Sequence, residues 1–341
     1  MKILTKITAL SLVASLTFAL AACSGTNTTG TSSAVRTFEE EAGGRRPIQI
    51  GFEGGLCQAP LAIAHLNGFF EAEGLTTELV VTGDLVNTRD ALAGGQIDVA
   101  AGMIAGWFRP VVQGIDMRFT VGLHTGCASA FVLNDSGITG FESGQDIAIS
   151  GAIGGAFHNI AYRFIYRDGF TPDDFTWRDF PAAEAVIALQ NGTVQVAVIP
   201  DQVAERWVED GTLRRIRSLH EDSDFADEAC CIAGLSGSFI DENPITSYKI
   251  TRAIYNASRW IDESDENRLA ATTLLIEEGL ISGTPEYAAD LLGLFRFGLP
   301  HDVTDQTLRT TIDEYQALEI LDPNLDPAVI REQVWYPLGI D

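Results

Sequence analysis

Lysine is almost absent from this chain. Only Lys2, Lys6 and Lys249 occur among its 341 residues, and the first two stand at the extreme N-terminus. A Walker A phosphate loop, a pyridoxal Schiff base and a lysine general base each require a lysine in a specific local setting. Lys249 lies instead in ITSYKITRAIY, a segment with helical spacing. These lysine-dependent chemistries are therefore disfavoured.

Basic residues as a whole are scarce. The sequence has 22 Lys and Arg against 47 Asp and Glu, which gives a formal net charge of −25 at pH 7. A field of that sign repels the phosphate backbone of DNA and RNA. Nucleic acid is therefore excluded as a partner.

The sequence lacks the motifs of several enzyme and redox classes. Neither G-x-S-x-G nor H-E-x-x-H occurs, and no C-x-x-C is present. Five cysteines are too few and too scattered for a disulfide scaffold in a chain of this length. Cys57, Cys127, Cys230 and Cys231 stay open to three interpretations, as free thiols, disulfide partners or metal ligands.

The first residues have the pattern of an exported lipoprotein. Lys2 and Lys6 introduce a mostly apolar stretch over residues 7–22, which is shorter than the ~20 residues of a membrane-spanning helix. It ends in LAAC, the bacterial lipobox, so we expect removal of residues 1–22 and lipid attachment at Cys23. Because both leader lysines are lost, the net charge falls from −25 to −27.

The residues after Cys23 predict a flexible tether. Residues 24–33 (SGTNTTGTSS) contain no apolar side chain, and we place the tether over residues 23–46. The expected location is the cell membrane, with the protein lipid-anchored on its extracytoplasmic face.

The remaining chain predicts an α/β fold. Four short apolar strands alternate with helical segments between residues 47 and 123, which indicates a parallel sheet with helical crossovers. The pattern restarts after Cys127, with strands at 128–134, 146–150, 194–199 and 213–219. From about Asp241 only helices are expected, and they have no sheet of their own, so we expect them to pack on the first α/β unit.

Three stretches carry a resemblance to a known family. APLAIAHLNGFFEAEGL, ALAGGQIDVAAG and FIDENP resemble, in that order, segments of the substrate-binding proteins of ABC importers for nitrate, sulfonates, taurine and thiamine-type pyrimidines. The resemblance implies a two-lobed periplasmic-binding-protein-like fold of type II, with a ligand cleft between the lobes and two hinge crossings near 125–129 and 230–235. Lobe 1 would comprise residues 47–127 and 232–341, and lobe 2 residues 128–231.

The same resemblance implies function and partners. The protein would be a non-enzymatic receptor without a cofactor or metal, which captures a small molecule and delivers it to the permease and ATPase subunits of an ABC importer. The ligand would be a sulfonate, nitrate, a small carboxylate or a thiamine-type pyrimidine.

Five loops at the carboxyl ends of the expected strands are candidate ligand-binding segments, because ligands of open α/β sheets bind there. Glycines allow the backbone to approach a ligand, an amide offers a donor and an acceptor, and helix N-termini suit anions. Each loop also has a structural interpretation, as a turn, as core packing or as a helix cap. The candidate residues are Gly55, Cys57, Gln58, Met103, Ile104, Trp107, His124, Cys127, Gly154, Gly155, His158 and Asp201.

Three alternatives remain beside this interpretation, and one of them is a binding protein of the same fold that signals rather than transports. Cys57 with His124 or His158 would suit a cysteine hydrolase. The cysteines and these two histidines would also suit Cu(I) or Zn(II), or a thiol ligand, in a receptor of the same fold. The five loops contain no arginine, but Arg109 and Arg163 lie one helical turn beyond them and are expected to be able to reach an anion.

Overall fold

The computed structural model describes residues 37–82 and 87–340. The predicted leader, Cys23 and most of the predicted tether lie outside the described residues. No helix within the described ranges is long and apolar enough to cross a membrane.

Lobe 1 is built on a five-stranded sheet with the order β2-β1-β3-β10-β4. β1, β2, β3 and β4 run parallel, whereas β10 runs antiparallel between β3 and β4. The expected all-parallel sheet is therefore wrong in this respect, because β10 is the strand by which the chain returns from lobe 2. The bounds are Ile48–Phe52 (β1), Thr77–Val81 (β2), Val99–Met103 (β3), Arg118–Thr125 (β4) and Ala229–Leu235 (β10).

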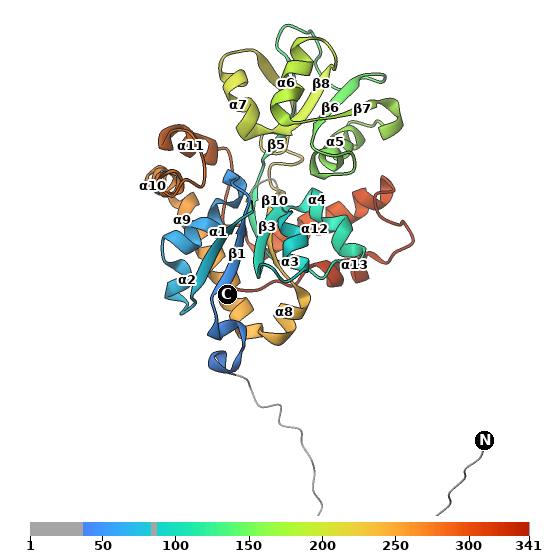
Figure 1. Ribbon diagram of the computed structural model, residues 1–341. Coiled ribbons are helices and arrows are strands. Elements are labelled where there is room, and N and C mark those ends of the chain that lie inside the picture. The colour runs from blue at the N-terminus through green and yellow to red at the C-terminus, as the bar shows by residue number, and fades with distance from the viewer. Residues whose placement is uncertain (1–36, 83–86, 341) are drawn as a thin grey trace, which may run out of the picture. The chain divides into compact units, whose positions relative to one another are not determined.

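Lobe 2 repeats this plan with the order β7-β6-β8-β5-β9, in which β5 is the antiparallel strand between β8 and β9. The edge strand β7 was not predicted, because its sequence TWRDF alternates large and charged side chains and none of them is buried. Figure 1 draws this lobe above the first, in green and yellow. The bounds are Ala128–Leu133 (β5), Asp146–Ser150 (β6), Thr176–Phe180 (β7), Val196–Pro200 (β8) and Leu213–Ser218 (β9).

Helices connect the strands as the periodicity predicted, with one break. The segment predicted as the first helix forms two helices. Gly68 adopts φ 77°, a left-handed conformation that separates the first helix from the second, which begins at Phe69. The helices that follow strands are Ala59–Leu66 (α1), Phe69–Ala72 (α2), Thr88–Ala93 (α3), Ile104–Val112 (α4), Ala156–Arg167 (α5), Ala182–Gln190 (α6) and Asp201–Glu209 (α7), with 3-10 turns at Leu56–Gln58 (η3) and Pro172–Asp174 (η5).

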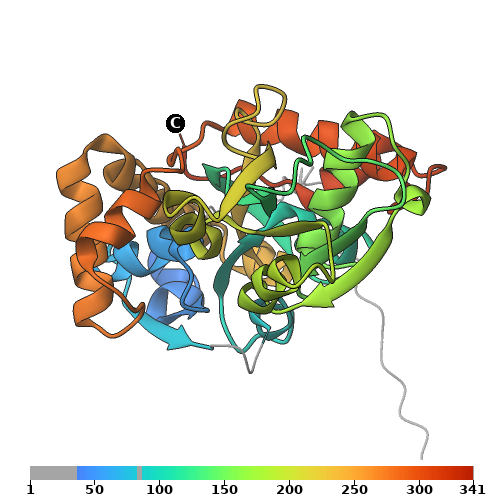
Figure 2. The ribbon, with the colours of Figure 1, turned by 90° about the horizontal axis from the view of Figure 1, so that it is seen from above.

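The C-terminal helices cover lobe 1. α9 packs on α1 and α2, α12 contacts β4 and β10, and α13 contacts α4. Their apolar side chains, among them the fully buried Ile254 and Leu308, complete the core of that lobe. Figure 2 shows these orange and red helices seen from above. The bounds are Gly237–Glu242 (α8), Pro244–Glu263 (α9), Asp265–Glu277 (α10), Pro285–Leu292 (α11), His301–Ala317 (α12) and Pro327–Val334 (α13).

The segment from Thr37 to Arg46 is folded, although it was predicted as part of the tether. It forms two 3-10 turns, Phe38–Glu40 (η1) and Gly43–Arg45 (η2). The buried Glu41 carboxylate accepts hydrogen bonds from the backbone N–H groups of Ile245 and Thr246 at the start of α9. A carboxylate at a helix N-terminus is stabilised by the helix dipole, so this segment is fixed to lobe 1.

Two crossings join the lobes. The first runs from β4 to β5 through Gly126 and Cys127, which have φ 80° and 94°. The second runs from β9 to β10, and a disulfide between Cys127 and Cys230 ties the two together. The two-lobed fold expected from the sequence is confirmed.

Candidate functional site

A cavity of about 610 Å³ lies at the carboxyl ends of the strands, between the two lobes. Lobe 1 contributes the loop after β1, the start of α3, the end of β3 and the start of α4. Lobe 2 contributes the start of α5 and the end of β8. The lining residues are Glu53, Gly54, Gly55, Cys57, Gln58, Asn87, Arg89, Gly102, Met103, Gly106, Trp107, Cys127, Gly155, Ala156, Phe157, Pro200, Gln202 and Cys231.

Seven of the twelve predicted ligand-binding residues line this cavity, namely Gly55, Cys57, Gln58, Met103, Trp107, Cys127 and Gly155. The other five do not. Ile104 faces a small enclosed space of about 20 Å³ beside Ala105 and Ile160. Gly154, His158 and Asp201 are engaged elsewhere, as described below, and His124 is buried beside the lining residues Cys57 and Cys231.

The loop after β1 leaves open space at its glycines, whereas its Gln58 amide is fully hydrogen-bonded within the protein. Gly54 has φ 97°, and a side-chain carbon on Gly55 would meet no atom within 4 Å. The Gln58 amide, in contrast, is occupied: its Oε1 accepts from the backbone N–H of Glu53 at 2.7 Å, and its Nε2 donates to the Glu53 carboxylate and to the Ala101 carbonyl. Gln58 therefore positions Glu53 rather than offering a free amide to a ligand.

Trp107 forms one wall of the cavity, but the helix starts three residues earlier than expected, at Ile104. The indole lies directly across Gly102, since a side-chain carbon there would come within 2.2 Å of the ring. Gly106 is less tightly constrained, but its missing side chain leaves room for Ala156 of lobe 2. Two glycines thus allow the aromatic wall and the opposite lobe to approach lobe 1.

Arg89 is a cavity residue that the sequence did not reveal. It lies in the first turn of α3, and its guanidinium pairs with Asp90 at 3.0 Å. The signal available in the sequence was its place just after the expected strand-to-helix loop. Arg109 and Arg163, which the sequence suggested instead, do not line the cavity: Arg109 is exposed, and Arg163 is buried against Glu228 and Glu314.

The start of α5 presents backbone to the cavity through Gly155, Ala156 and Phe157. His158 turns away into an aromatic niche, with its ring 4.2 Å from that of Tyr162 and 4.7 Å from that of Trp177. Gly154 donates its N–H to His158 Nδ1, which explains why neither residue lines the cavity. Burial lowers the pKa of His158 to about 4, so the ring is neutral at pH 7.

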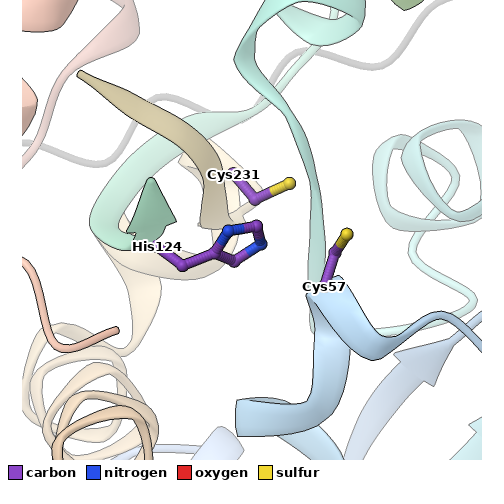
Figure 3. A group of neighbouring side chains, drawn as sticks. All are labelled: Cys57, His124 and Cys231. Atoms are coloured by element: carbon purple, nitrogen blue, oxygen red, sulfur yellow. The ribbon is translucent and has the colours of Figure 1, made fainter. Parts of the chain in front are cut away.

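Cys57, His124 and Cys231 form a cluster at the cavity wall (Figure 3). One ligating atom of each residue lies within 4.8 Å of the others. The Cys231 thiol stabilises the Cys57 thiolate and, with a smaller contribution from His124, lowers the pKa of Cys57 to about 5 against the opposing effect of burial. The pKa of Cys231 is raised well above its usual range by the neighbouring Cys57 and by burial.

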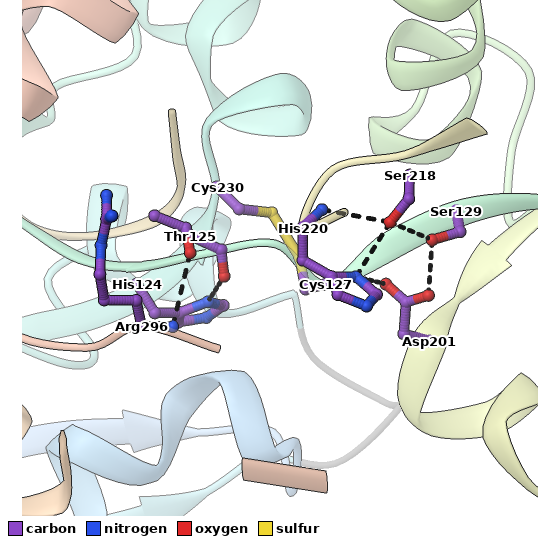
Figure 4. The surroundings of a disulfide bond; sticks show 9 residues. All are labelled: His124, Thr125, Cys127, Ser129, Asp201, Ser218, His220, Cys230 and Arg296. Carbon is purple, nitrogen blue, oxygen red and sulfur yellow. Dashed lines mark hydrogen bonds and ion pairs between the residues drawn. A yellow bond between two sulfur atoms is a disulfide. The ribbon is translucent and has the colours of Figure 1, made fainter. Parts of the chain in front are cut away.

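Asp201 belongs to a buried cluster beside the disulfide (Figure 4). Ser129 Oγ donates to Asp201 Oδ1 at 2.6 Å, Arg215 pairs with the same oxygen at 3.2 Å, and His220 Nδ1 lies 3.4 Å from Oδ2. Pro200 is the N-cap of α7, so Asp201 is not the cap that the sequence allowed. Its carboxylate is buried inside lobe 2 and does not line the cavity.

This cluster does not have the geometry of a catalytic triad. Ser218 Oγ lies 3.0 Å from His220 Nδ1, the same nitrogen that faces Asp201. A serine nucleophile and an orienting carboxylate need opposite ring nitrogens. The group holds β5, α7 and β9 together rather than activating a hydroxyl.

Four charged side chains join the lobes beside the cavity. Arg163 and Arg167 of α5 both pair with Glu314 of α12 and with Glu228, which precedes β10. Burial alone would lower the pKa of Arg163, but Glu228 and Glu314 raise it. Ala105 adds neutral contacts, since its carbonyl accepts hydrogen bonds from Asn159 of lobe 2 and from Tyr315.

Comparison with known proteins agrees with this geometry. Residues 41–276 match the NMT1-like family, and no curated protein is similar enough in sequence to match. The alkanesulfonate-binding protein SsuA from Xanthomonas axonopodis pv. citri, bound to MOPS, has 18% identity and a TM-score of 0.65 over 85% of this chain and 98% of that one.

Two further solved structures share the fold. The periplasmic nitrate-binding protein NrtA from Synechocystis PCC 6803 has 16% identity and a TM-score of 0.66, covering 84% of this chain and 85% of that one. The desulfurization enzyme DSZB has 16% identity and a TM-score of 0.58, with coverages of 84% and 96%. The fold is thus that of periplasmic substrate-binding proteins of ABC importers, and the family match extends over more than half of the sequence. The chain belongs to the NMT1-like family.

Proposed function

We propose that this protein is the substrate-binding component of an ABC importer, anchored to the extracytoplasmic face of the cell membrane by a lipid on Cys23. It closes its two lobes on one small molecule and delivers that molecule to the permease. The observation that carries the proposal is the cavity of about 610 Å³, which is lined by both lobes and is of the size that small-molecule sites usually have.

The cavity groups favour a ligand with a flat or apolar body and one anionic group. Trp107, Met103 and Phe157 supply apolar walls. Arg89 and the backbone at the start of α5 supply the positive end, because a guanidinium and a helix N-terminus both attract an anion. Gln202 adds a buried amide oxygen that has no hydrogen-bond partner within the described residues. Sulfonates, carboxylates and nitrate fit the charge, and a thiamine-type pyrimidine fits the walls.

A ligand screen tests the proposal. The melting temperature of the purified protein would be measured with an alkanesulfonate, nitrate, a small carboxylate and an aminopyrimidine, and each hit would be titrated calorimetrically. We expect one class to raise the melting temperature, because a ligand that binds only the folded state stabilises it. No shift with any of the four classes would contradict the proposed ligand range.

Gly55→Asp tests whether the cavity is the binding site. Position 55 has open space and φ −92°, so the new side chain adds a carboxylate without a clash. We expect affinity for the hit to fall at least tenfold, which corresponds to about 1.4 kcal/mol. Gly140→Asp is the matched control, since it adds the same charge at an equally open position outside the cavity. Equal affinities of the two variants would place the site elsewhere.

Arg89→Gln distinguishes the ligand classes. Removal of a hydrogen bond to a charged group costs about 1.5–3 kcal/mol, roughly 10- to 150-fold in affinity. We expect that loss for an anionic ligand and almost none for a neutral pyrimidine. Arg109→Gln, on the exposed side of α4, serves as the control.

A further inference from the structure

Three potential metal ligands converge on the wall of the cavity from three separate parts of lobe 1. Cys57 lies in η3, His124 in β4 and Cys231 in β10. His124 and Cys231 are partners across adjacent antiparallel strands, which puts their side chains on the same face of the sheet. Figure 3 shows the three side chains as neighbours that come from separate segments of the chain.

The His124 ring is held in the tautomer that leaves Nε2 able to bind a metal. His124 Nδ1 lies 2.9 Å from the carbonyl oxygen of Thr125. A carbonyl only accepts, so Nδ1 carries the hydrogen and Nε2 carries the lone pair. Metal-binding histidines are held in this way, by a hydrogen bond from the ring nitrogen that does not bind the metal.

The second ring nitrogen, Nε2, is buried and makes no hydrogen bond to the part of the chain that the structure describes. The His124 side chain is fully buried, and its Nε2 has no hydrogen-bond partner within residues 37–82 and 87–340. Phe295 and Phe297 enclose the ring, with centroid distances of 4.8 and 5.1 Å. A buried acceptor without a donor is unfavourable, and a cation at this point would satisfy it.

The donor set and its charge match a divalent thiophilic ion. Two thiolates and a neutral imidazole bind zinc in proteins, and they neutralise its two positive charges. In a tetrahedral zinc site the ligand atoms lie about 3.6–3.8 Å apart. The three atoms here lie within 4.8 Å of one another, so binding requires a contraction of about 1 Å or less.

We propose that Cys57, His124 and Cys231 form a Zn(II) site that leaves one coordination position open to the cavity. Cys57 and Cys231 both line the cavity, so the fourth ligand comes from that side, as water or as an anionic donor of the captured molecule. The metal site stands by itself, whereas its contact with a captured molecule rests on the proposed function. On binding, two Zn–S bonds and one Zn–N bond replace three bonds from zinc to water, and any proton that the two sulfur atoms still hold leaves to solvent.

Direct metal titration tests the site. The purified protein, with the Cys127–Cys230 disulfide intact and two free thiols verified by mass spectrometry, would be titrated with Zn(II) against a chromophoric chelator. We expect one zinc per chain. Co(II) in place of zinc is expected to give a thiolate-to-metal charge-transfer band, which only sulfur ligation produces. Less than 0.2 zinc per chain, or cobalt without that band, overturns the proposal.

Ligand variants assign the three residues. Cys57→Ser, Cys231→Ser and His124→Gln should each weaken zinc binding by more than about 100-fold, because even second-shell changes cost 10–100-fold. His65→Gln, a half-buried histidine outside the cluster, is the matched control and should retain full affinity. Where a buried substitution prevents folding, the half-buried Cys57→Ser carries the test. Full zinc affinity in Cys57→Ser overturns the proposal.

The same purified protein also tests two competing interpretations of the cluster, a disulfide and a copper site. A Cys57–Cys231 disulfide in protein purified with zinc present would show that the thiols form a redox pair and not a metal site. Thiolates generally prefer Cu(I). If Cu(I) binds more tightly than this preference explains and prevents zinc from binding in a competition experiment, the zinc assignment is likewise overturned. Capture of the small molecule would be measured with and without Zn(II), so failure of the metal site and failure of the proposed function give different results.

Discussion

Gly106 of lobe 1 and Ala156 of lobe 2 face each other so closely that a side-chain carbon at position 106 would lie 3.1 Å from the Ala156 methyl group. The two residues lie near the N-terminal ends of α4 and α5, at the edge of the cavity. The approach of the lobes at this point therefore depends on the absence of a side chain.

Gly106→Leu should hold the lobes apart. We expect a larger radius of gyration by small-angle scattering in the presence of ligand, and an affinity at least tenfold lower, since contacts made by both lobes are lost. Gly106→Ala should have an intermediate effect because it demands only a small shift. Equal affinity across the glycine, alanine and leucine forms would show that this contact does not limit closure.

Glu314→Gln should destabilise the protein strongly. The substitution leaves Arg163 and Arg167 facing each other with one carboxylate, Glu228, between them. Loss of one partner of a buried ion pair costs about 3–5 kcal/mol, because it leaves an uncompensated buried charge. Urea unfolding measures the effect, and the exposed Glu332→Gln is the control. A shift no larger than that of the control would contradict a structural role for the four-residue network.

His220 should make stability depend on pH. Burial disfavours its charged form, but Asp201 outweighs burial and raises the pKa of His220 above its ordinary value of 6.5. The stabilisation is therefore fully present below pH 6.5 and is lost as pH rises through the raised pKa. We expect His220→Gln to lower the melting temperature more at pH 6 than at pH 9.

His158 is the control, because its contribution to stability should depend on pH in the opposite direction. Its pKa is lowered to about 4, so its contribution is present above pH 6.5 and is lost as pH falls toward 4. The melting-temperature difference between wild type and His158→Gln should accordingly shrink in acid, whereas that of His220→Gln grows. Parallel pH profiles for the two variants would contradict these assignments.

The Cys127–Cys230 disulfide should contribute substantially to stability. It closes a loop of 103 residues, for which loss of chain entropy in the unfolded state predicts about 4–5 kcal/mol. Replacement of both cysteines by alanine should lower the urea midpoint accordingly, while Cys57→Ala, outside the disulfide, should have a smaller effect. A double variant as stable as wild type would show that the hinge does not need the bond.

Local patterns predicted two α/β units and the helices that return to the first of them, because strands and helices alternate with clear apolar periods and the return helices lack a sheet. The two-lobed arrangement with its cleft and crossings came from the family resemblance, and the antiparallel β10 and the edge strand β7 came from neither. The position of the cavity followed from the rule that ligands bind at the carboxyl ends of strands. The individual roles did not follow. Nothing near Gln58 in the sequence indicates that Glu53 and Ala101 occupy its amide, since Ala101 is 43 residues away.

The partners of the histidines and cysteines also depend on tertiary contacts. His158 and Trp177 come from different elements and meet only in the folded lobe. Cys127 forms its disulfide with Cys230, whereas the neighbouring Cys231 lies opposite His124 in the register of β10 and β4. Residue spacing in the sequence does not reveal this register. Arg89 follows an expected strand-to-helix loop but was not among the candidates, although it lines the cavity.

The disulfide at the crossings also determines how the folded chain would respond to force. Tension applied between Thr37 and Ile340 reaches Cys127, passes through its sulfur to Cys230, and continues along β10. Lobe 2 lies outside that path, so its 103-residue loop, roughly 340–370 Å when fully extended, stays unstretched while the bond is intact. Reduction of one covalent bond would add that length to the extensible chain.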